Sequence, residues 1–146
     1  MNFSNHIFGM AAIVFFLSCA AVMSPPGGPK DITPPELIET FPKDGTVNYK
    51  GNLIELQFSE YIDESSIDRA IHILPTLRTS PELIYKDKKI LVALPDSLEK
   101  DQTYIVVINR NLSDENKVKL AQGIQVAFST GDQIDEGSIS GKTYHS

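Results

Sequence analysis

The sequence has no tryptophan, a single cysteine and no run of lysine or arginine. One cysteine excludes an internal disulfide, so the fold must be held by a hydrophobic core, for which 41% hydrophobic residues are sufficient. The formal net charge of -6, without a basic cluster, argues against nucleic acid as a partner. No second apolar stretch after the N-terminus is long enough to span a bilayer.

The sequence also lacks a catalytic pattern. His6 and His145 lie near the two ends of the chain, and His72 falls in a predicted strand, so a histidine-based relay has no evident partners. Ser59 and Glu60 follow another predicted strand, and we interpret Glu60 as an acceptor of backbone hydrogen bonds at the loop. We therefore predict that the protein is not an enzyme and has no cofactor.

An uncharged apolar run at residues 7–18 ends at Cys19. It is too short for a transmembrane helix but suits the hydrophobic region of a secretory signal. Residues 16–19, Phe-Leu-Ser-Cys, resemble a bacterial lipobox. The resemblance implies a signal peptide at 1–18, cleavage before Cys19, and a membrane anchor made by acyl chains on Cys19. The alternatives are an ordinary secretory signal or a buried apolar helix with a free thiol.

Residues 20–35 contain five prolines and two glycines, a composition that predicts a flexible tether over 19–35 between the lipid and a folded domain. No acidic residue directly follows Cys19. Surface-exported lipoproteins are similar to one another in having acidic residues just after the cysteine. An aspartate directly after the cysteine resembles an inner-membrane retention signal. These absences predict an outer-membrane lipoprotein that faces the periplasm.

From residue 36 onward, short apolar alternations are separated by turn residues, as in an all-β sandwich. The segment 59–67 breaks the alternation and predicts a loop with a short helical turn capped by Asp63 or Ser65. Lysine-rich residues 86–89 predict a hairpin tip, and 109–123 a long polar connection. The pattern predicts a seven-stranded Ig-like antiparallel β-sandwich at 36–131, with strands at 37–41, 53–58, 71–74, 83–85, 90–94, 104–108 and 124–129.

Residues 132–146 contain one more strand-like segment, at 138–144, with nothing behind it to pair with. We interpret this region as the start of a further β module or as a disordered tail.

Four segments in this order resemble the bacterial Ig-like domain first described in S-layer proteins. They are Pro34–Gly45, Ile54–Glu60 with its Phe-Ser-Glu end, Leu98–Tyr104 with its Thr-Tyr pair, and Phe128–Gly131. The resemblance covers about residues 32–131. Together with the lipobox and the proline-rich tether, it is similar to Ig-like-domain lipoproteins of Bacteroidetes. Relatives of this kind usually continue into further β modules.

Three further groups of residues are weaker candidates. Carboxylates of two loops, at 63–64 and 114–116, could hold calcium, but neither loop has the spaced order of a loop site, so we interpret both as solvated and predict no metal. Ser97 lies in an Asp-Ser-Leu segment that resembles an O-glycosylation acceptor of Bacteroidetes. Without tryptophan, a glycan-binding surface would depend on Tyr49, Tyr61 and Tyr85.

The sequence thus predicts a non-enzymatic, lipid-anchored Ig-like protein of the cell envelope. It would act as a spacer or as a protein-interaction module whose partners are the membrane and envelope proteins. The alternative is an envelope module that binds a glycan or another ligand.

Overall fold

The computed structural model describes residues 27–95 and 98–135, and its compact sandwich unit begins at Asp31. Several predictions lie outside the described residues: the signal peptide 1–18, Cys19, Ser97, the strand at 138–144, and His6 and His145. Among the residues that are described, no helix is both long and apolar enough to cross a membrane.

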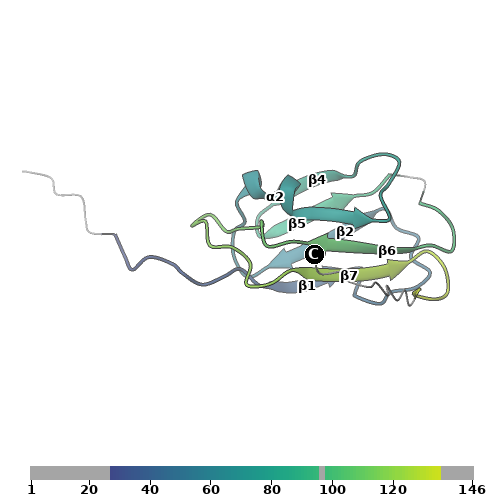
Figure 1. The fold of residues 1–146 in the computed structure, drawn as a ribbon, viewed down its shortest axis with the longest axis horizontal. Helices are drawn as coiled ribbons and strands as arrows, with labels where there is room; N and C mark the ends of the chain where they lie inside the picture. Colours follow the sequence, from purple (N-terminus) through teal and green to yellow (C-terminus); the bar gives the residue numbers. More distant parts are fainter. Residues whose placement is uncertain (1–26, 96–97, 136–146) are drawn as a thin grey trace, which may run out of the picture. The chain divides into compact units, whose positions relative to one another are not determined.

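Seven strands of the described chain form two antiparallel sheets that enclose a common core, which confirms the predicted Ig-like β-sandwich (Figure 1). One sheet has the order β1-β2-β5-β4 and the other the order β3-β6-β7. Each predicted strand agrees with the observed one to within one residue at either end. The strands are β1 (Leu37–Phe41), β2 (Leu53–Phe58), β3 (Ile71–Leu74), β4 (Glu82–Lys86), β5 (Lys89–Ala93), β6 (Thr103–Ile108) and β7 (Ile124–Ser129).

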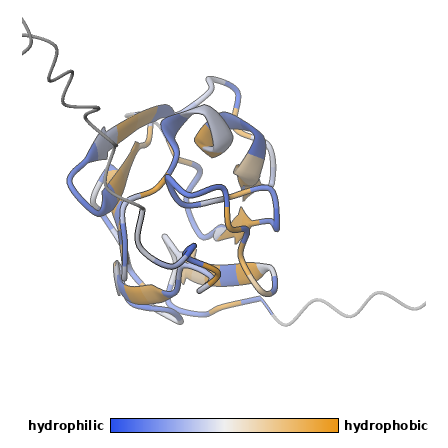
Figure 2. Cartoon of the chain, turned by 90° about the vertical axis from the view of Figure 1, so that its left-hand side faces the viewer, coloured by the Kyte–Doolittle hydropathy of each residue, from blue (hydrophilic) through white to orange (hydrophobic). Residues whose placement is uncertain are grey.

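The core is built from alternate residues of the strands, because successive side chains of a strand point to opposite faces of its sheet. In β2, Ile54, Leu56 and Phe58 are completely buried, as the alternation predicts. They join inward residues of β5, β6 and β7 in one cluster. Figure 2 shows the hydrophobic colour mainly on the strands, and the hydrophilic colour along most connecting loops. Burial of each such aliphatic or phenylalanine side chain stabilises the folded state by about 1.5–3 kcal/mol.

After β1, residues 43–45 lead into a segment that the strand pattern did not reveal. Gly45, with φ of 78°, donates its backbone N–H to Ala127 O, and Ser129 N donates to Thr46 O. Thr46 pairs with Phe128 in a parallel bridge. The segment Gly45–Tyr49 therefore covers the outer edge of β7, and such coverage protects an edge strand from pairing with other chains.

Two connections complete the core at one end of the sandwich. The predicted helical turn is a short helix, α2 (Glu64–Ala70), which buries Ile67 and Ala70. The connection at 109–123 was predicted to be polar, but it buries Leu112 and Leu120. Its apolar residues are too few and too widely spaced to form a strand pattern, so their burial depends on the sheets beneath them.

Asp63 caps α2, and we predict a measurable cost for its removal. Its carboxylate accepts a hydrogen bond from Ser65 N at 3.2 Å and forms an ion pair of 2.6 Å with Lys117. Asp63→Ala should lower the free energy of unfolding by about 1–2 kcal/mol, because it leaves a helix N–H without a partner. Urea denaturation measures the change. Asp63→Asn, which keeps the cap acceptor, should lose less than half as much, and equal losses would contradict the capping role.

Candidate functional site

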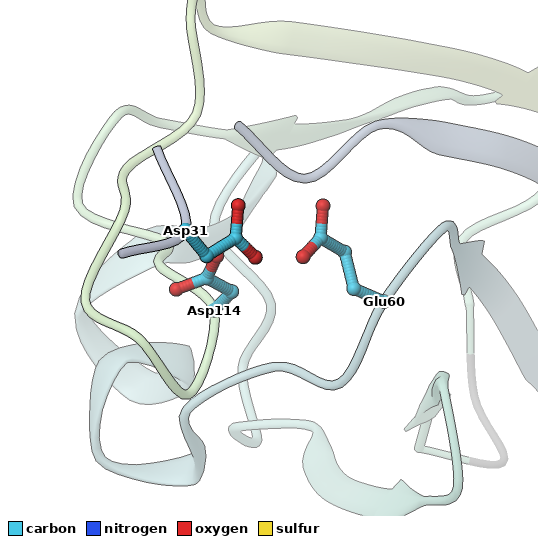
Figure 3. Close-up of side chains that lie close together, drawn as sticks. All are labelled: Asp31, Glu60 and Asp114. Atoms are coloured by element: carbon cyan, nitrogen blue, oxygen red, sulfur yellow. The ribbon is translucent and has the colours of Figure 1, made fainter. Parts of the chain in front are cut away.

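Three carboxylates gather at one end of the sandwich, although they are far apart in the sequence (Figure 3). Asp31 precedes β1, Glu60 follows β2, and Asp114 lies in the connection between β6 and β7. One oxygen atom from each side chain lies within 4.8 Å of the other two. The three residues therefore form an acidic cluster, and this name is kept for them below.

Backbone pairing explains why these segments meet. The start of β1 is tied to the end of β2, because Ser59 N donates to Glu36 O and Glu36 N donates to Ser59 Oγ, both at 2.9 Å. Ile62 and Asp114 form an antiparallel bridge, which brings the loop after Glu60 against the connection at 109–123. Main-chain contacts thus position Glu60 and Asp114, whereas Asp31 is tied to the same connection by a side-chain hydrogen bond from Asn116 Nδ2.

Asp114 is the buried member of the acidic cluster, with 1% of its surface exposed. Its Oδ1 accepts a hydrogen bond of 2.8 Å from Val118 N. Its Oδ2 is buried and has no hydrogen-bond partner among the described residues. A buried carboxylate oxygen without a partner is costly, and most such atoms in proteins are paired. The prediction that the loop at 114–116 is solvated is therefore wrong for Asp114, which the bridge to Ile62 draws inward, whereas Glu115 and Asn116 are exposed as predicted.

Asp31 and Glu60 are partly exposed and differ in their surroundings. Asp31 accepts hydrogen bonds from Thr33 N at 2.9 Å and from Asn116 Nδ2 at 3.2 Å. The hydrogen bond from the Thr33 backbone lowers the pKa of Asp31. Desolvation raises the pKa of Glu60, and the negative charges of Asp31 and Asp114 raise it further. The cluster is therefore a place where negative charge is concentrated and incompletely compensated.

Two lysines of neighbouring loops make contacts outside the acidic cluster. Lys88 donates to Ser59 O at 2.9 Å and lies 5.4 Å from the centre of the Tyr61 ring, although its charge partly offsets the raised pKa of Glu60. Lys117 is paired with Asp63. None of the three ion pairs found among the described residues includes a member of the acidic cluster.

The predicted role of Glu60 is taken by its neighbour. Within the described chain, Ser59 makes the hydrogen bonds that join the loop to β1, and no hydrogen bond to the Glu60 carboxylate is found there. The prediction for Glu60 is therefore wrong, because the serine hydroxyl and the Ser59 backbone already satisfy the groups at the strand end. Glu60 is left to face the other two carboxylates.

The three tyrosines do not form an exposed cluster. Tyr49 is 9% exposed and packs edge-on against Phe128, with ring centres 5.3 Å apart. Tyr85 is partly buried, and its hydroxyl accepts a hydrogen bond of 2.8 Å from Ile62 N. Only Tyr61, at 48%, is well exposed among the three. Tyr49 and Tyr85, on which the glycan-binding alternative partly depends, are thus engaged in packing and hydrogen bonding within the fold.

His72 lies in β3, as predicted, and is exposed. It borders a surface hollow of about 570 Å³ that is also lined by Asp68 and Ser80. The contact found for its ring is with Asn109 Nδ2 at 3.3 Å. Among the described residues, no hydrogen bond joins His72 to a carboxylate or to a hydroxyl, so the hollow does not assemble a relay of the Ser-His-Asp kind.

Sequence reasoning found Asp114 as a candidate ligand but missed Asp31 and Glu60. The other two carboxylates that it considered, Asp63 and Glu64, lie at the start of α2 outside the cluster. No local spacing in the sequence links the three carboxylates. The one signal that could have indicated an unusual carboxylate is the position of Asp114 in the chain between two leucines, Leu112 and Leu120, which are both buried.

Comparisons with known proteins identify the fold family. A sequence comparison with curated proteins gives no match. Among solved structures, the chain is similar to an L,D-transpeptidase from Mycobacterium smegmatis, with 18% identity, a TM-score of 0.48, and coverage of 68% of this chain and 41% of that one. It is also similar to the S-layer protein rSbsC, with 18% identity, a TM-score of 0.46, and coverage of 70% and 14%.

This chain thus spans less than half the length of either protein. The model of the family described as "Bacterial Ig-like domain" matches residues 31–130, which is more than half of the chain. The chain therefore belongs to the bacterial Ig-like domain family.

Proposed function

We propose that this protein is a lipid-anchored, non-enzymatic module of the bacterial cell envelope that acts as a spacer or protein-interaction domain. The observation that carries the proposal is the order of its parts: an uncharged apolar run, Cys19, a proline-rich segment and then an Ig-like domain. The Ig-like domain is a non-catalytic fold. A lipid on Cys19 would fix one end of the chain, and the segment 19–35 would set the reach of the domain.

The free edge of the four-stranded sheet supports an interaction role. Within the described sheet, β1 pairs with β2 alone, so its other side is open. Two large apolar side chains of this strand are exposed, Ile38 at 66% and Phe41 at 57%. An edge strand with exposed apolar residues can accept an added strand from a partner. The proposed partners are proteins of the envelope.

The proposal includes an outer-membrane location facing the periplasm. It rests on the sequence after Cys19, Ala-Ala-Val-Met-Ser, which has no acidic residue. Protease added to intact cells should leave the protein uncut, whereas protease added after the outer membrane is opened should degrade it. Cleavage in intact cells would contradict the periplasmic orientation and leave the lipid anchor standing.

Lipid attachment is tested by labelling cells with an alkyne analogue of palmitate and measuring the mature N-terminus by mass spectrometry. We expect the mature chain to begin at an acylated Cys19, and Cys19→Ala to lose the label completely, because no other residue supplies the thiol. Ser18→Ala is the matched control and should keep the label. A mature chain that begins elsewhere, or label retained in Cys19→Ala, would overturn the anchor.

A further inference from the structure

We propose that Asp31, Glu60 and Asp114 form a calcium-binding site that joins the segment before β1 to the loops at this end of the sandwich. All three residues lie within the matched domain, so the proposal does not rest on the lipid anchor. Two independent observations carry it. The first is the convergence of three carboxylates from three segments, and the second is the buried, unpartnered Oδ2 of Asp114.

The orientation of Asp114 favours a ligand in the acidic cluster. Its Oδ1 is held by Val118 N, and its backbone N–H donates to Val118 O at 3.0 Å. The carboxylate is therefore fixed by the loop, and the remaining oxygen is the one available to a cation. In Figure 3, the Asp114 carboxylate lies beside that of Asp31, and Glu60 faces both from the opposite segment.

The donor set indicates a hard cation. Carboxylate oxygens, without histidine or cysteine, suit Ca²⁺ or Mg²⁺ rather than zinc or copper. Two oxygens bound to one Ca²⁺ at 2.3–2.6 Å can be at most about 5.2 Å apart, so oxygens within 4.8 Å of one another fit a single ion. Ca²⁺ also tolerates irregular geometry and completes its shell with water, whereas Mg²⁺ demands a near-ideal octahedron. Asp31 and Glu60 are partly exposed, so water can reach the site and complete the coordination shell.

Bound calcium would remove two unfavourable features at once. It would give the Asp114 Oδ2 atom a partner, and it would compensate the mutual repulsion that, with desolvation, raises the pKa of Glu60. Asp31 is already held near the loop by Asn116. A shared ion would attach the segment before β1 to the loops of the domain. A mechanical force applied from the N-terminal side would then be transmitted to the sandwich through the site.

The test is calcium titration of the full chain in detergent after treatment with a chelator, followed by calorimetry and by thermal denaturation. We expect one Ca²⁺ per chain with a Kd of about 10⁻⁴ to 10⁻³ M, as in extracellular modules. At about 10 mM CaCl₂, Tm should rise by roughly 5 °C or more. MgCl₂ at equal concentration should give a clearly smaller rise. An equal rise with NaCl of matched ionic strength would mean simple screening and would overturn the site.

Two variants separate ligation from structure. Glu60→Gln removes a partly exposed carboxylate that makes no hydrogen bond within the described chain, so it should fold and bind calcium at least tenfold more weakly. Glu36→Gln removes a charge that also acts on Glu60 but lies outside the acidic cluster, and it should bind within about twofold of the wild type. Equal affinities of both variants, or a wild type that takes up no calcium, would overturn the proposal.

Discussion

Replacing Val106 by aspartate is expected to unfold the domain, whereas the same replacement at the adjacent Val107 is expected to leave it folded. Both residues belong to β6, but their side chains point to opposite faces of the sheet. Val106 is completely buried in the core, and Val107 is only partly buried. The pair therefore compares one chemical change on the two faces of a single strand.

The size of the effect follows from where the new charge would lie. An unpaired carboxylate in the core costs several kcal/mol, and the lost burial of valine adds about 1.5–3 kcal/mol. A domain of this size has only about 5–15 kcal/mol of stability in total. At position 107 the carboxylate would lie beside His72 and Gln125, the polar cross-strand neighbours of Val107, both of which are exposed. The cost there should be about 1 kcal/mol, from strand propensity alone.

Circular dichroism during thermal denaturation measures both variants. Val106→Asp should show no cooperative transition, and Val107→Asp should keep the wild-type signal with a Tm lower by about 4–8 °C. If the two variants lost equal stability, the assignment of inner and outer faces in β6 would be wrong. If Val106→Asp stayed fully folded, water would have to reach the centre of the sandwich.

Phe128→Ala is expected to lower the free energy of unfolding by about 3–5 kcal/mol, because it leaves a cavity in the core. Phe128 is completely buried in β7. Its ring stacks on Tyr104, with centres 5.5 Å apart, and meets Tyr49 edge-on at 5.3 Å. The phenylalanine thus joins β6, β7 and the segment Gly45–Tyr49.

Phe41→Ala is the matched control for this experiment. Phe41 contacts the same aromatic group through Tyr49, with ring centres 6.2 Å apart, but it is 57% exposed. Its removal should cost about 1 kcal/mol or less, the usual value of one aromatic pair. Urea denaturation of both variants gives the comparison. A loss at Phe41 as large as that at Phe128 would mean that the aromatic contacts, and not burial, determine stability here.

The strands could be predicted because their signal is local. In β2, the alternation of apolar and polar residues sets both the element and its inner face, and the observed burial follows it residue by residue. The cap of α2 was also readable as Asp63 or Ser65, and the structure assigns it to Asp63, whose carboxylate accepts from a backbone N–H of the first turn. Cys19 and Ser97 lie outside the described residues and stay predictions.

The acidic cluster could not be predicted in the same way. Glu60 has a local explanation as a loop residue, and Asp31 has one as part of a tether, so neither sequence context indicated a shared site. Tyr49 similarly reads as a surface aromatic until the parallel pairing of Thr46 with Phe128 carries it against the core. In each case the decisive contact joins residues that are distant in the chain.

The sequence by itself therefore determined the elements of this protein: the strands, the capped helix and the family to which the domain belongs. Hydrophobic alternation and capping act over a few residues, so the chain specifies them without reference to the rest of the fold. Only the tertiary structure decided which loops meet, and so brought Asp31, Glu60 and Asp114 together with one carboxylate oxygen buried and unpartnered. Strand pairing between distant segments sets that arrangement, and no local pattern encodes it.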